Sequence, residues 1–150
     1  GRLAQLNGVV SMALDSIGRL YLADAFNNRI RRIDLHNREV TDSSVTPVTY
    51  AHVPWITTFA GTGTYSFSGD GGLAVAASFR RPISVAVSPV DDDVYVGVDN
   101  RIRQVSNKTG VIRTIAGLGT AGFSGDDGRA DLAILNMSSG GGMAVDLLGN

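Results

Sequence analysis

Apolar residues in this chain gather in short runs that are bounded by Gly, Asn and Asp. Runs of this length, rich in Val, Ile, Leu and Tyr and flanked by turn-forming residues, are typical of β-strands. They occur twice in the same order, which predicts two sets of four strands. The first set comprises residues 10–14, 19–23, 29–34 and 55–59, and the second comprises 83–87, 93–98, 101–105 and 111–115.

Several of these runs are apolar at consecutive positions, as in 85–87 and 94–98. A strand with one solvated face alternates apolar and polar residues, so consecutive apolar residues indicate a sheet that is covered on both faces. The sequence contains no strong amphipathic helix that could cover them. We therefore predict an all-β fold in which sheets pack on sheets, as the four-stranded blades of a β-propeller do.

An internal repeat supports this modular organisation. Residues 58–79, TFAGTGTYSFSGDGGLAVAASF, return as residues 114–135, TIAGLGTAGFSGDDGRADLAIL, with 12 of 22 positions identical. Such self-similarity is typical of repeat architectures. We expect the tail of a preceding linker at 1–9, one repeat at 10–82, a second at 83–141, and the first strand of a further repeat within 142–150.

Four segments of the first repeat carry a family resemblance: LYLAD at 20–24, NNRIRRID at 27–34, ITTFAG at 56–61 and FSGDGG at 67–72. Together they resemble the NHL repeat, in the subgroup with a long Ser-Gly-Asp-Gly linker. The resemblance implies a β-propeller of four-stranded NHL-type blades, here two complete blades plus the first strand of another. The remaining blades of the ring would come from the same chain or from self-association.

Two departures from the pattern are visible. The turn at 99–100 is two residues shorter than its counterpart in the first repeat, and Asp127 replaces the glycine found at Gly71.

Composition narrows the range of functions. A net charge of −1 and a pI near 6.1 argue against a broad basic surface for nucleic acid. The absence of cysteine excludes disulfides, thiolate metal sites and cysteine nucleophiles. No apolar run approaches the roughly 18 residues of a membrane span. His36 and His52 do not have metal-ligand spacing, so we predict no catalytic residue, metal site or cofactor.

Basic residues form a strip on equivalent strands of the two repeats: Arg29, Arg31, Arg32, Arg101 and Arg103. One interpretation is a surface for an anionic partner such as RNA phosphates, which some NHL-repeat proteins bind. We favour the other, in which these arginines lie between blades and pair with carboxylates. The candidate carboxylates are Asp24, Asp34, Asp70 and Asp126.

The repeated Ser-Gly-Asp loop contains Asp70, Asp126 and Asp127. Glycines beside a carboxylate can hold an ion or a phosphate. The Ala-rich segments that follow are expected to form one or two helical turns, and an aspartate just before a helix is commonly its N-cap. We therefore favour capping for Asp70 and Asp126.

The first repeat also carries an insertion within 37–54 that has no counterpart in the second. Binding residues tend to collect on long loops of rigid scaffolds. Tyr50 and His52, with Trp55 directly after the insertion, form an aromatic and titratable cluster that the repeated pattern leaves unexplained, and we take them as candidate binding residues.

The function that these features favour is a noncatalytic scaffold with a protein partner. One alternative is a propeller enzyme, a metal-dependent lyase or hydrolase whose catalytic residues lie outside this chain. The resemblance raises that alternative, because NHL-like scaffolds include the peptidylglycine-amidating lyases, which rely on metal-binding histidines. A second alternative is an RNA-binding surface.

Overall fold

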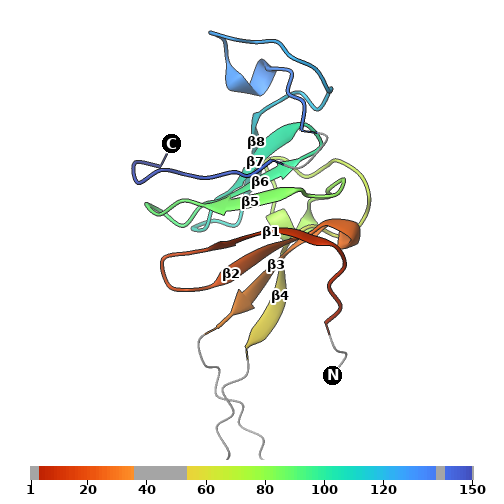
Figure 1. Ribbon diagram of the computed structural model, residues 1–150. Coiled ribbons are helices and arrows are strands. Elements are labelled where there is room, and N and C mark those ends of the chain that lie inside the picture. Colours follow the sequence, from red (N-terminus) through yellow and green to blue (C-terminus); the bar gives the residue numbers. More distant parts are fainter. Residues whose placement is uncertain (1–3, 36–53, 138–140, 150) are drawn as a thin grey trace, which may run out of the picture.

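The computed structural model describes residues 4–35, 54–137 and 141–149. These residues form two four-stranded antiparallel sheets, with two single 3₁₀ turns between strands and a third after the last strand (Figure 1). The first sheet contains β1 (Val9–Leu14), β2 (Leu20–Asp24), β3 (Arg29–Asp34) and β4 (Trp55–Ala60), and the second contains β5 (Ser84–Val87), β6 (Val94–Val98), β7 (Arg101–Val105) and β8 (Ile112–Ala116). All eight predicted strands are confirmed, each bound lying within one residue of the prediction.

Each sheet is a meander in which consecutive strands pair, in the orders β1-β2-β3-β4 and β5-β6-β7-β8. The turn between β6 and β7 consists of Asp99 and Asn100, whose φ angles are 56° and 54°. Two left-handed residues in a two-residue hairpin match the right-handed twist of the strands, and Asp and Asn tolerate that conformation well. The corresponding turn of the first sheet is longer and contains a 3₁₀ turn over Ala25–Asn27.

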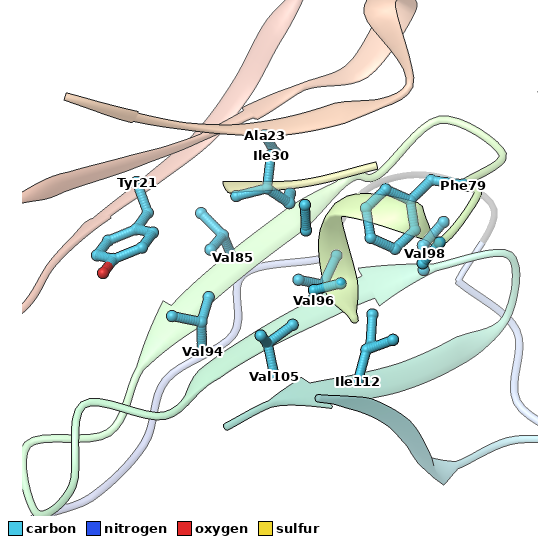
Figure 2. Close-up of a cluster of buried hydrophobic side chains, with 13 residues drawn as sticks. Tyr21, Ala23, Ile30, Phe79, Val85, Val94, Val96, Val98, Val105 and Ile112 are labelled. Atoms are coloured by element: carbon cyan, nitrogen blue, oxygen red, sulfur yellow. The ribbon is translucent and has the colours of Figure 1, made fainter. Parts of the chain in front are cut away.

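The two sheets pack on each other, with β1 against β5. Their shared core holds Tyr21 and Ile30 from the first sheet and Val85, Val94 and Val96 from the second, each at most 3% exposed. Figure 2 shows these side chains together in one cluster. Because the cluster also lies between the two sheets, the predicted covering of sheet by sheet is confirmed for this pair. The two described sheets do not by themselves close a ring.

The predicted first strand of a further repeat does not form. Residues 141–149 contain no strand, although they run extended past β5 in Figure 1. A β-strand needs a partner to which its N–H and C=O groups can bond. No described strand pairs with Met143, Ala144 or Val145, so this apolar segment does not form a hydrogen-bonded β-strand.

No helix among residues 4–35, 54–137 and 141–149 is long and apolar enough to cross a membrane.

Candidate binding surface

The segment between the two sheets, residues 61–79, is here named the first linker. It begins beside its own sheet, where the Gly61 and Thr62 N–H groups donate to the carbonyls of Ala74 and Ala77 at 2.9 and 2.8 Å. Its middle then lies along the free edge of β8 in the second sheet. Gly71 N donates to Ile112 O at 2.8 Å, and Ile112 N donates to Gly72 O at 2.9 Å. The first linker therefore folds back on itself after the first sheet and is joined to the second sheet by main-chain hydrogen bonds.

Arg103 of β7 fastens the first linker to the second sheet. Its guanidinium donates to Asp70 Oδ1 from Nη2 at 2.6 Å and from Nε at 3.1 Å. It also donates to the carbonyl oxygens of Ser68 at 2.9 Å and Ser78 at 3.2 Å. Arg103 is 0% exposed, whereas the Asp70 side chain is 38% exposed, so the guanidinium is removed from bulk water and the carboxylate is not. The expectation that strip arginines pair with carboxylates between blades holds for this residue.

The capping role expected for Asp70 is wrong. The 3₁₀ turn that follows begins at Ala74, its N-cap residue is Leu73, and no side chain caps it. The intervening glycines run along the edge of β8, which places Asp70 beside Arg103 and not at the start of the turn. The equivalent turn at Ala130–Leu132 also lacks a side-chain cap, so Asp126 is not an N-cap either.

Electrostatics agree with an ionised Asp70. Partial burial raises the pKa of this carboxyl, but polar contacts from Thr114 and Arg103, together with the positive charge of Arg103, lower it by more. Its pKa therefore lies below the ordinary value, as expected for a carboxylate paired with a cation.

An aromatic residue of the first linker adds to the junction. The ring of Phe67 lies 3.9 Å from the guanidinium carbon of Arg101 and 4.8 Å from that of Arg103. Arg103 also lies over Phe79, at 5.4 Å from its centroid. Such cation–π contacts are most favourable when they are desolvated. The sequence analysis did not select Phe67, although the recurrence of Phe at 67 and 123 was a usable signal.

Except for Arg32, the remaining strip arginines bind main-chain or carboxylate oxygens close to their own sheets, Arg101 in addition to its contact with Phe67. Arg29 donates to the carbonyls of Asn27 and Thr62, and Arg101 makes the equivalent bonds to Asp99 and Leu118. Arg31 Nη1 lies 3.5 Å from Asp24 Oδ2. Arg32 lies on the same strand, and its Nε is buried without a hydrogen-bond partner.

Residues 117–137, here named the second linker, repeat the first linker, but no sheet of the described residues lies against their middle as the second sheet lies against the first linker. Phe123, the counterpart of Phe67, is 85% exposed. Asp126, the counterpart of Asp70, and Asp127 are exposed. Figure 1 shows the second linker projecting beyond the end of β8. It presents an aromatic ring and carboxylates to solvent in the order used by the first linker.

The first sheet has an equally open face. Val10, Met12 and Leu14 alternate along β1 and are 57%, 65% and 58% exposed. Their neighbours Ser11 and Ala13 point the other way, and Ser11 Oγ accepts a hydrogen bond from Val85 N at 3.1 Å. Val85, the counterpart of Met12 in the second repeat, is 3% exposed because the first sheet covers it.

Of the three candidate binding residues of the insertion, the structure describes Trp55. Tyr50 and His52 lie outside the described residues. Trp55 is the first residue of β4, at 48% exposure. Over residues 4–35, 54–137 and 141–149 there is no group of three His, Cys, Asp or Glu side chains placed to hold a metal ion.

Comparisons with known proteins support the fold and indicate no function. No family model matches the chain, and no curated protein matches it either. Among solved structures, the chain is similar to a structural genomics protein of unknown function from Bacteroides thetaiotaomicron VPI-5482, with a TM-score of 0.56 and 20% sequence identity. The match covers 79% of this chain and 26% of that protein. The chain thus spans about a quarter of the length of the structure it resembles.

Proposed function

We propose that this chain is a noncatalytic scaffold of NHL-type propeller blades that recognises protein through the open face of its first sheet. The observation that carries the proposal is the row of Val10, Met12 and Leu14, all more than half exposed on one face of β1. Contiguous exposed apolar side chains of this kind mark protein-interaction sites. Their counterparts in the second repeat are where the protein already packs one sheet on another.

The arginine strip favours this function over RNA binding. Arg103 is 0% exposed and holds Asp70, and Arg101 lies against Phe67. Phosphate contacts require guanidinium groups that nucleic acid can reach. The strongest basic cluster of the strip is therefore used between the blades.

A retention experiment with matched variants tests the proposal. Tagged wild-type chain, the double variant Met12→Asp/Leu14→Asp and the control Val90→Asp are compared for the proteins they retain from cells. Val90 is 63% exposed but lies in the β5–β6 turn of the second sheet and not on β1. Circular dichroism establishes that all three are folded.

We expect a stoichiometric protein partner, another copy of the chain included, that wild type and Val90→Asp retain and the double variant loses. If all three chains retained the same proteins in the same amounts, the open face would not be a recognition surface and the proposal would fail.

A further inference from the structure

We infer that the protein recognised at the open face is a second copy of this chain, docked head to tail. The second linker of one copy lies on the edge of the β1–β4 sheet of the next. This inference rests on the proposed function and adds the identity of the partner. It follows from a comparison of two halves of one junction, both present in this chain.

The junction between the first linker and the β5–β8 sheet is complete within the chain, and it defines the groups that a junction between two copies requires. A linker supplies a phenylalanine, an aspartate and main-chain groups, and a sheet supplies two arginines and a strand edge. Phe67 lies on Arg101 and Arg103, and Asp70 pairs with Arg103. The main-chain bonds run from Gly71 N to Ile112 O, from Ile112 N to Gly72 O, and from Ala74 N to Gly110 O.

The second linker already has the conformation that supplies the linker half. Gly128 N donates to Gly125 O at 3.1 Å, as Gly72 N donates to Gly69 O at 3.1 Å. Ser124 bridges to Ile134 as Ser68 bridges to Ser78. The linker therefore does not have to fold on binding, which lowers the entropic cost of association.

Its binding groups are also free to be used. Phe123 is 85% exposed, whereas Phe67 is half-buried beneath the two arginines. Asp126 is exposed where Asp70 holds Arg103.

The β1–β4 sheet supplies the other half at the same positions. Arg29 and Arg31 stand on β3 where Arg101 and Arg103 stand on β7. Arg31 lies 3.5 Å from Asp24, a residue that Val98 replaces in the second sheet, so Asp126 of the second copy would share this guanidinium with Asp24. Ile56 pairs with Ile33 as Ile112 pairs with Val105, so the N–H and C=O groups of Ile56 point to the outer edge. Pro54 replaces Gly110 but keeps the carbonyl oxygen, which is the only group of Gly110 that the linker uses.

The apolar face agrees with the same arrangement. Met12 and Leu14 occupy in the first sheet the positions that Val85 and Val87 occupy in the second. Within the chain, the β1–β4 sheet covers Val85. A second copy would cover Met12 and Leu14 with its β5–β8 sheet. Donor and acceptor halves lie on different parts of the chain, so the contact is heterologous and leads to a ring or an open chain of copies.

Charge reversal provides the test. Sedimentation velocity over a concentration series measures self-association of the wild-type chain and of the variants Arg31→Asp and Asp126→Arg. Each variant alone places like charges across the interface. We expect each to associate at least about tenfold more weakly than wild type. An equimolar mixture restores one reversed pair and one native pair, so we expect association to return and to be confined to mixed species.

Lys108→Asp is the control, because Lys108 is an exposed cation in the β7–β8 turn, and it should associate like wild type. Recovery in the mixture also shows that both reversed variants are folded. A wild-type chain that stays monomeric at every concentration would overturn the inference. So would variants that associate normally, or folded variants whose mixture does not recover. If the Met12→Asp/Leu14→Asp chain still lost another protein partner in those cases, the proposed function would stand without the inference.

Discussion

Replacing Asp70 by Asn separates two roles that an aspartate in this linker could have. A capping aspartate tolerates Asn almost without loss, because Asn is an equally good N-cap. An aspartate that neutralises a buried guanidinium does not. The structure gives Asp70 the second role, with two donors of Arg103 directed at its Oδ1 atom.

The size of the effect follows from the surroundings of the pair. Asn retains an oxygen acceptor but loses the negative charge, and hydrogen bonds to charged groups contribute about 1 kcal/mol more than neutral ones. With two such bonds, Asp70→Asn should lower the free energy of unfolding by about 1–2 kcal/mol. Asp70→Ala removes the acceptor as well. Breaking a buried pair costs about 3–5 kcal/mol, but the Asp70 side chain is 38% exposed and water can take its place, so we expect about 2–4 kcal/mol.

Urea denaturation at low protein concentration measures these differences, read as a shift of the midpoint at unchanged slope. Asp126→Asn is the matched control, since this residue occupies the same position in the second linker with no arginine against it. It should change stability by less than about 0.5 kcal/mol. The difference between wild type and Asp70→Asn should also shrink as the pH falls through the lowered pKa of Asp70, because both side chains are then neutral. Equal stability of the Asp70→Asn and Asp126→Asn chains would refute the ion-pair reasoning.

Four further substitutions have defined outcomes. Gly61→Ala should lower the free energy of unfolding by more than about 2 kcal/mol, because Gly61 has φ of 97° and a Cβ there would lie 2.6 Å from Asn28 O. Gly71→Ala should lower it by only about 1–2 kcal/mol, the cost of the left-handed backbone, because Gly71 has φ of 82° but open space around it. Phe79→Ala should cost about 3–5 kcal/mol in the same assay, since Phe79 is 1% exposed in the shared core, and a loss below about 1 kcal/mol would contradict that packing. Burial raises the pKa of Asp15, but hydrogen bonds and the charge of Arg19 lower it by more, so folding stability should be lost as the pH falls below about 4, and Asp15→Asn should flatten that part of a pH-dependent melting curve.

The sequence alone determined where the strands lie. Runs such as 94–98 and 101–105 carry local signals, β-branched residues between turn formers, and local signals survive in any tertiary context. The internal repeat also predicted the modular organisation, because two copies of one sequence pattern form the same four-stranded sheet. That arginines of the strip would pair with aspartates was also predictable from the sequence, since charged groups near a core require partners.

Only the tertiary structure decided how those parts meet. Asp70 and Arg103 are 33 positions apart, and nothing near Asp70 in sequence distinguishes a carboxylate that caps a turn from one that reaches the next blade. The same limit explains residues 141–149, whose apolar pattern predicts a strand that no neighbouring strand completes. Phe67 and Phe123 are both followed by Ser-Gly-Asp, yet one is covered by two arginines and the other is 85% exposed. A strand is a local preference, whereas an interface exists only where a second surface is present to complete it.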